Sequence, residues 1–147
     1  MTFVEHIVTY KPNLKKRIFA TLFDYGLYLL AFWAYLFTFG KADDEGVYKV
    51  EGLLALPVFI AWFLWFVVVE ALQGATPGHQ IFSLKVVQLN GSTISFWQAL
   101  LRHLLDPVDI LFYGIPAIIA IKFSEKHQRL GDMVARTVVV DASAHKT

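Results

Sequence analysis

An aspartate inside an apolar segment is the first chemically unusual residue of this chain. Residues 18–39 contain Asp24 as their only charged side chain, and Arg17 stands immediately before them. Residues seven apart lie on one face of a helix, about 10 Å apart along its axis. An aspartate in a membrane helix costs about 2.5–3.5 kcal/mol, so it needs a partner or a task. Asp24 is therefore predicted either to bind a cation or proton, or to lock helix packing against an arginine or a backbone group.

Three further carboxylates stand near the ends of apolar segments. Asp106 and Asp109 flank Pro107, and acids beside unwound backbone bind cations in several transporters. The plainer prediction is that both face water at a solvated turn. Glu70 is predicted to lie at a membrane interface, or to complete a site with Asp24. The candidates for transport or ion binding are Asp24, Glu70, Asp106 and Asp109.

Arg102 and His103 lie in a segment with the pattern of a short amphipathic helix. A basic helix of this kind favours contact with lipid headgroups, and a histidine there could also carry protons. His79, His103 and His127 have no metal-ligand spacing, and no nucleophile–base pair or phosphate loop stands out. We therefore predict no enzyme activity, no cofactor and no bound metal.

The composition is that of a membrane protein. Apolar residues make up 56% of the chain and charged residues 17%, against roughly 25% charged in soluble domains. A domain of 147 residues cannot bury that much apolar surface in its own core. The net charge of +1 gives no basic face for nucleic acid, and the absence of cysteine excludes disulfides and thiolate chemistry. The N-terminal segment lacks the apolar region of a signal peptide, so the first apolar segment is expected to remain in the mature protein.

Two segments have the length of a complete membrane crossing. Residues 18–39 and 53–72 are each predicted to be a transmembrane helix, since a bilayer core needs roughly 20 apolar residues. Between them, residues 40–52 form a polar, acidic loop. Pro57 lies near the start of the second helix, where a missing backbone hydrogen bond is tolerated.

A short β-structure is predicted after the second helix. Residues 73–78 (QGATPG) end that helix, and residues 81–96 are rich in residues that favour strands. Asn90-Gly91 is a strong signal for a type I′ turn, which needs two positive φ angles. The prediction is a small cytoplasmic β-hairpin over residues 81–96.

The next apolar segment, residues 96–121, is interrupted. Asp106 precedes Pro107, and a residue before proline is disfavoured in the helical conformation. Neither piece is a comfortable full crossing, so we predict a broken or re-entrant helical hairpin, with a single third crossing as the alternative. The polar tail, residues 122–147, contains a strand-like TVVV at 137–140. The fold class is an all-α integral membrane protein with one domain, residues 1–147.

The distribution of lysine and arginine favours the hairpin. If residues 96–121 enter and return, eleven Lys and Arg lie on one side and two on the other. With a single crossing the two sides carry six and seven, which decides nothing. The helical hairpin of residues 96–121 makes both termini cytoplasmic. It also lets residues 137–140 pair with the predicted β-hairpin of residues 81–96. No internal repeat is visible, so an inverted-repeat transporter within one chain is not indicated.

These residues resemble the RDD family of small bacterial membrane proteins, named after one arginine and two aspartates. The resemblance covers about residues 13–141 and assigns the three name-giving positions to Arg17, Asp24 and Asp132. Other matching residues are Thr76, Pro77, Gly78, the strand from Leu84 to Val87, Gly91, Arg102, Gly131 and the stretch from Ala135 to Val139. His79 departs from the family, which usually has a basic residue there; lipid phosphate binding at this position would become pH-dependent.

The resemblance implies a place in the bacterial inner membrane and, from one member, sodium–proton exchange. It also implies that Asp132 matters. Arg-Leu-Gly-Asp suggests a helix N-cap, so Asp132 is predicted to cap a short helix, or to pair with Arg17 or Arg102.

Two functions remain open at this point. The first is a cation or proton transporter, oligomeric because two helices and a broken hairpin are few to enclose a path. The second is a scaffold or accessory subunit that binds partner membrane proteins. Transport requires Asp24 to face water and titrate, whereas the scaffold requires it to be paired and inert. Membrane lipid is a partner in either case.

Overall fold

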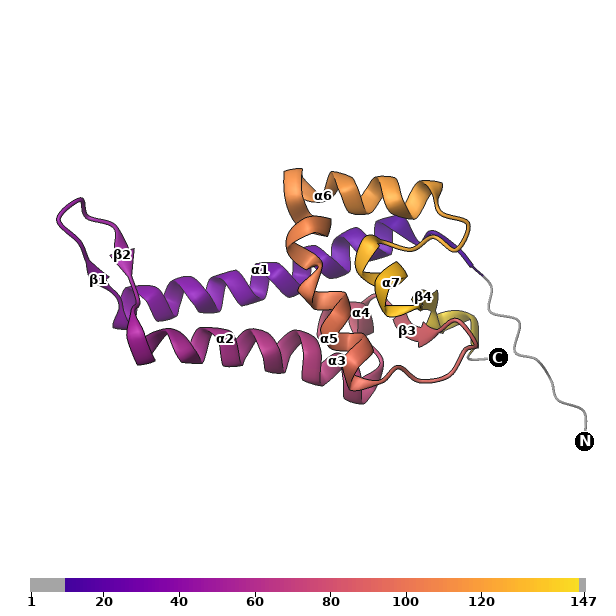
Figure 1. Ribbon diagram of the computed structural model, residues 1–147, viewed down its shortest axis with the longest axis horizontal. Helices are drawn as coiled ribbons and strands as arrows, with labels where there is room; N and C mark the ends of the chain where they lie inside the picture. The colour runs from indigo at the N-terminus through magenta and orange to yellow at the C-terminus, as the bar shows by residue number, and fades with distance from the viewer. Residues whose placement is uncertain (1–9, 146–147) are drawn as a thin grey trace, which may run out of the picture.

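The computed structural model describes residues 10–145, and two long antiparallel helices form its frame (Figure 1). The first is α1 (Leu14–Phe39). The second runs from Gly52 to Gln73 through η1 (Gly52–Ala55), α2 (Leu56–Trp62), η2 (Phe63–Val68) and α3 (Val69–Gln73). Both are long and apolar enough to cross a membrane. The helices predicted at residues 18–39 and 53–72 are therefore confirmed.

The connection between these helices is more ordered than the predicted loop. Strands β1 (Lys41–Ala42) and β2 (Tyr48–Lys49) pair antiparallel, at the far left of Figure 1. The Asp43 carboxylate accepts the backbone N–H groups of Glu45 and Val47, which closes the turn. This side-chain capping made a hairpin from a segment with little strand propensity.

A π-helical turn interrupts the second long helix. The π-helical segment η2 ends at Val68, two residues before Glu70. Within η2, Phe66 and Val67 are buried. A π-turn contains more residues than an α-turn, so it changes the direction in which all later side chains point. Glu70 is thereby turned into the protein interior, where it is 0% exposed.

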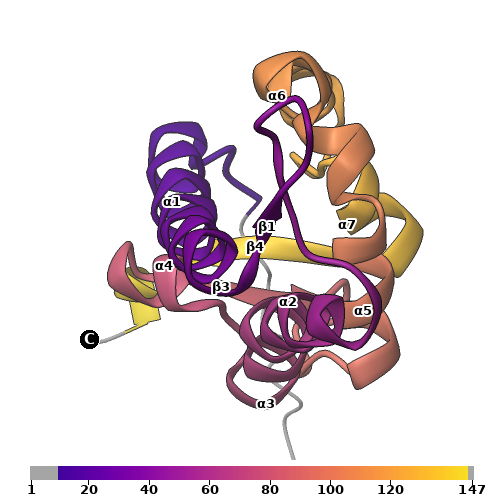
Figure 2. The same cartoon turned by 90° about the vertical axis from the view of Figure 1, so that its left-hand side faces the viewer.

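The remaining elements gather around one end of the helical pair. They are α4 (Pro77–Ile81), β3 (Leu84–Gln88), α5 (Phe96–Leu104), α6 (Asp106–Phe123), α7 (Leu130–Ala135), β4 (Thr137–Asp141) and η3 (Ala142–His145). Viewed along the long helices, β3 and β4 pass behind them, with α5 and α6 to one side (Figure 2). Of the predicted tail, residues 146 and 147 lie outside the described part.

The β-hairpin predicted over residues 81–96 is wrong in its pairing, because its first strand pairs mainly with another part of the chain. Strand β3 pairs with β4, with Val86 opposite Val139, so the predicted pairing with residues 137–140 is confirmed. The second arm of the hairpin is reduced to one bridge, between Val87 and Thr93. Of the turn pair Asn90-Gly91 only the glycine has a positive φ, so the turn is not type I′.

The start of α5 explains the short second arm. Ser95 accepts the backbone N–H of Gln98, and the Gln98 side chain accepts the backbone N–H of Ser95. This capping box commits the chain to a helix from Phe96 onward. Too few residues remain between the turn and the cap for a full strand.

The break at Asp106-Pro107 is confirmed. Helices α5 and α6 are bent by 54° at this point. A second irregularity follows within α6, where Phe112, Tyr113 and Gly114 have positive φ angles. Pro116 comes just after it, in the first turn of the resumed helix, where proline costs little. The predicted hairpin segment thus has two breaks instead of one.

Candidate functional site

Charged and polar side chains meet inside the folded end of the molecule. We call them the buried polar cluster; each has a side chain no more than about 12% exposed. Its members come from the long helices, from α4, α5, α6 and α7, and from the residues that immediately precede α4 and α7. They are Arg17, Asp24, Glu70, Thr76, His79, Arg102, His103, Asp106, Asp109, Arg129 and Asp132.

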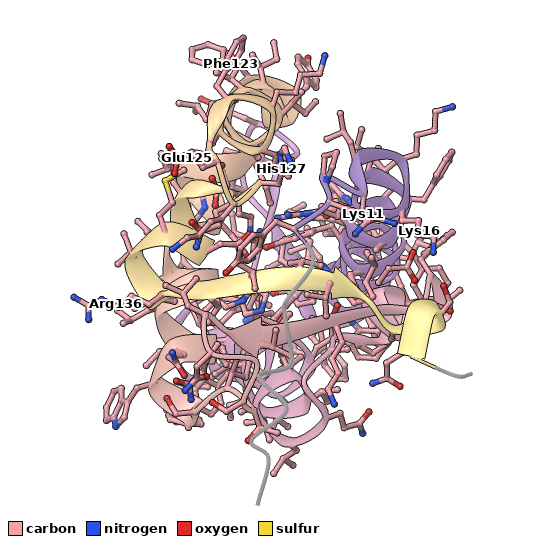
Figure 3. The ribbon with its side chains drawn as sticks, turned by 90° about the vertical axis from the view of Figure 1, so that its right-hand side faces the viewer. Lys11, Lys16, Phe123, Glu125, His127 and Arg136 are labelled. Atoms are coloured by element: carbon pink, nitrogen blue, oxygen red, sulfur yellow. The ribbon has the colours of Figure 1, made fainter. Side chains whose placement is uncertain are left out.

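Asp132 is the centre of the ion pairs. Its carboxylate accepts from Arg17 Nη2 at 2.6 Å and from Arg102 Nη1. Both pairings suggested by the sequence are therefore present. Burial alone would raise the pKa of Asp132, but the guanidinium groups of Arg102 and Arg17 outweigh it and hold this pKa well below its usual range. Arg17 also donates from Nη1 to the carbonyl of His127 at 2.8 Å, a residue labelled near the end face in Figure 3.

The predicted N-cap role of Asp132 is wrong in detail. Helix α7 begins at Leu130, so Asp132 occupies its third position and reaches back to accept the Arg129 backbone N–H at 3.1 Å. The first amides of α7 are instead taken by Asp109, which accepts from Leu130 N and Gly131 N, each at 3.0 Å. A carboxylate distant in sequence thus satisfies the helix N-terminus.

Arg102 connects Asp132 to Glu70. Its Nε donates to Glu70 Oε1 at 2.7 Å, and its Nη1 also lies 3.1 Å from Thr137 Oγ1. Arg102 and Glu70 are both 0% exposed. The prediction of headgroup contact for Arg102 and His103 is therefore wrong, since His103 is also only 3% exposed. Glu70 faces the protein interior, and its position relative to a membrane interface stays a prediction. The polar face of α5 meets other polar groups of the chain instead of lipid headgroups.

His103 lies between two carboxylates. Its Nδ1 is 2.7 Å from Asp106 Oδ2, and its Nε2 is 3.3 Å from Glu70 Oε1. Tyr25 donates its hydroxyl to Asp106, and Arg129 Nη1 lies 2.7 Å from Asp106 Oδ1. The prediction of a solvated turn is wrong, because Asp106 is 3% and Asp109 0% exposed. The bend at Pro107 points both acids inward.

Asp24 has no arginine partner among the described residues. Its carboxylate accepts from Thr76 Oγ1 at 2.6 Å and from Gly78 N at 2.7 Å. These donors belong to the Thr-Pro-Gly motif at the start of α4. Of the two predicted roles for Asp24, this geometry provides the backbone partner. Arg17, on the same helix, reaches Asp132 instead.

His79 continues the contacts of Asp24. Its Nδ1 lies 2.6 Å from Thr76 Oγ1 and 3.8 Å from Asp24 Oδ2. Since the Thr76 hydroxyl donates to Asp24, its oxygen can accept a hydrogen bond from the Nδ1–H of neutral His79. Burial lowers the pKa of His79 below its ordinary value of 6.5. At 8% exposure it has little surface to offer a lipid phosphate.

The lowered pKa of His79 predicts a pH effect on stability. Between the folded and unfolded pKa values the unfolded chain binds more protons, so stability is full above about pH 6.5 and falls as the pH drops. The loss from this one group is at most about 1.4 kcal/mol per pH unit. In detergent, the free energy of unfolding of His79→Gln should decrease less than that of wild type between pH 7.5 and 5.5. Equal decreases would contradict the assignment.

Sequence reasoning missed three contributors to the cluster. Tyr25, Arg129 and Thr137 each contact a cluster acid or arginine. A signal existed for Arg129, which stands three residues before Asp132 and can therefore share a helix face with it. Within residues 10–145, no group of three or more His, Asp or Glu side chains is arranged to hold a metal ion.

Comparison with known proteins identifies one family. A model of the RDD family matches residues 11–136, which include every member of the buried polar cluster. No curated protein and no solved structure gives a match.

Proposed function

The chain belongs to the RDD family, and from this premise we propose that it exchanges a monovalent cation for protons across a membrane. The supporting observation is the charge composition of the buried polar cluster. Five carboxylates face three guanidinium groups and two histidines. With both histidines neutral, negative charges exceed positive ones by two. Buried excess charge is costly, so this cluster favours uptake of protons or of a cation.

The geometry divides the four candidate carboxylates into two pairs. Asp24 and Asp109 are bound by backbone amides of short helices. Glu70 and Asp106 share His103 instead. A histidine can gain or lose a proton, and the contact of Nδ1 with Asp106 Oδ2 holds this ring beside both acids. We therefore propose His103, with Glu70 and Asp106, as the group that handles the proton.

Flux measurements in liposomes test this function. Purified protein is reconstituted with an internal pH dye, and sodium, potassium or lithium gradients are applied. We expect cation-driven proton movement in wild type and its loss in folded His103→Gln and Asp106→Asn variants. Asp44→Asn, which alters an exposed acid between β1 and β2, is the matched control and should retain flux. Absence of flux in wild-type liposomes that respond to a control ionophore would reject transport.

Orientation is part of the proposal. The excess of lysine and arginine outside residues 40–52 supports a cytoplasmic N-terminus in a bacterial inner membrane. The chain has no cysteine, so a single cysteine can be introduced cleanly. In intact cells, an impermeant maleimide should label Asp44→Cys and not Lys11→Cys, while both should react after lysis. The reverse pattern would invert the topology.

A second candidate, a scaffold for partner membrane proteins, is supported by the exposed sides of α1. Leu22, Leu30 and Phe37 are 62%, 70% and 62% exposed, which leaves apolar surface for a lipid tail or another helix. The inert partners of Asp24 fit this role as well. A scaffold predicts no flux, together with a reproducible partner cross-linked from α1 in native membranes.

A further inference from the structure

Two parts of the chain use the same spacing of an arginine and an aspartate. Asp24 is the seventh residue after Arg17, and Asp109 is the seventh residue after Arg102. Each aspartate accepts the backbone N–H of a glycine in the first turn of a short helix. The distances are 2.7 Å for Gly78 N to Asp24 Oδ1 and 3.0 Å for Gly131 N to Asp109 Oδ2.

The correspondence continues after each glycine. The fifth residue after Gly78 is Ser83, with φ of 55°, and the fifth after Gly131 is Arg136, with φ of 54°. Positive φ is uncommon for residues other than glycine. A strand of five residues follows immediately in both places, as β3 and β4. Residues 78–88 and 131–141 therefore share one order of elements: the end of a short helix, a residue with positive φ and a strand of five residues.

The register of the two strands fits a local two-fold axis. In the correspondence just described, Leu84 is equivalent to Thr137 and Gln88 to Asp141. The observed pairs are Leu84 with Asp141 and Gln88 with Thr137, and the equivalent residues Val86 and Val139 face each other. Leu84 thus pairs with the equivalent of Gln88, and Gln88 pairs with the equivalent of Leu84, as a two-fold axis through the central Val86–Val139 pair requires. A shift by one residue would destroy this relation.

We propose that the chain contains two copies of one structural unit, in which an Arg–Asp helix holds a glycine-bearing short helix and the strand that follows it. In this unit Asp24 and Asp109 are equivalent docking carboxylates, and their ligand is the chain's own glycine amide. The first copy contains α1, α4 and β3, with the second long helix inserted between α1 and α4. The second contains α5, α6, α7 and β4, and its Arg–Asp helix is broken at Pro107. The inference does not depend on the proposed transport.

Close packing explains why glycine stands opposite both docking carboxylates. A Cβ built on Gly78 would meet the Ala20 carbonyl oxygen and lie 2.6 Å from Asp24 Oδ2. A Cβ on Gly131 would lie 2.5 Å from the Arg102 carbonyl oxygen and 3.2 Å from Asp109 Oδ2. In both copies the obstructing carbonyl belongs to the helix that carries the aspartate or to its continuation across the bend. A methyl group would therefore separate the short helix from its carboxylate.

Alanine substitutions test whether the Gly78–Asp24 and Gly131–Asp109 contacts are equivalent. Gly78→Ala and Gly131→Ala should each lower the melting temperature clearly and to a similar extent. Gly26→Ala is the matched control, since it adds the same methyl group to α1 with nothing within 4 Å, and it should leave the melting temperature unchanged or raise it. A tolerated alanine at either contact would contradict the proposal.

Amide exchange provides a local readout that global destabilisation cannot reproduce. Asp24→Asn should speed exchange of the Gly78 amide about tenfold or more, since a hydrogen bond to a charged group is replaced by a weaker one, and leave the Gly131 amide within about twofold. Asp109→Asn should give the opposite pattern. Equal acceleration of both amides by either variant, or of neither, would overturn the assignment. Because no transport is measured, failure of the flux assay and failure of this inference are separate results.

Discussion

Replacement of Asp132 by asparagine is expected to destabilise the protein by about 3–5 kcal/mol, the cost of breaking a buried ion pair from one side. The carboxylate lies between Arg17 and Arg102 and is 0% exposed. Asparagine keeps the shape but removes the charge, which leaves two buried guanidinium groups without a common counter-ion. The free energy of unfolding, measured by denaturant titration in detergent micelles, provides the check.

The surface pair of Lys16 and Asp141 supplies the control for this experiment. Their side chains are 39% and 21% exposed, with an Nζ–Oδ2 distance of 2.5 Å, and Lys16 is labelled on the end face seen in Figure 3. An exposed pair contributes about 0–1 kcal/mol, so Asp141→Asn should change stability little. If Asp132→Asn were as mild as Asp141→Asn, the central ion pairs would not hold the fold together.

Arg102→Lys is expected to destabilise the protein by about 3 kcal/mol although the charge is retained. The guanidinium contacts Glu70 through Nε and both Asp132 and Thr137 through Nη1. A lysine ammonium is a single point and cannot reach all three. One buried acid would therefore lose its counter-ion, and unfolding in detergent should occur at clearly lower denaturant concentration.

Arg136→Lys is the matched control for Arg102→Lys. Arg136 is exposed, and its substitution should change the free energy of unfolding by no more than about 0.5 kcal/mol. If Arg102→Lys stayed within the same limit, charge alone would suffice at position 102. The planar shape of the Arg102 guanidinium group would then be unimportant, contrary to the contacts described.

The RDD-family assignment and the two apolar helices could be predicted from the sequence. An apolar segment of about 20 residues has one stable conformation in lipid, because every backbone group must bond within the segment. The break before Pro107 was equally predictable, since proline restricts the residue in front of it. Arg17 and Asp24 could be recognised as unusual because charge is rare in or beside such segments, whereas Asp132, in the polar tail, was indicated only by the resemblance to the family.

The environment of the polar side chains could not be predicted in the same way. Arg102 and His103 lie on the polar face of α5, and an amphipathic pattern states only that one face is polar. Whether that face meets water, headgroups or other polar side chains depends on what packs against it. Here Glu70, turned inward after the π-helical segment η2, and Asp132 from α7 do so.

The partner of strand β3 was likewise decided by tertiary structure. Asn90-Gly91 favours a local hairpin, but the capping box at Ser95 begins α5 too early for a second arm, and β4 occupies the vacant edge. The repeated unit was hidden for a related reason: its two copies share mainly an arginine, an aspartate, a glycine and a strand. The apolar helices and the family could be read from the amino-acid sequence, because they depend on local composition and spacing. Which charges meet follows from the packing of distant segments, because an ion pair depends on the distance in space between residues up to 125 positions apart.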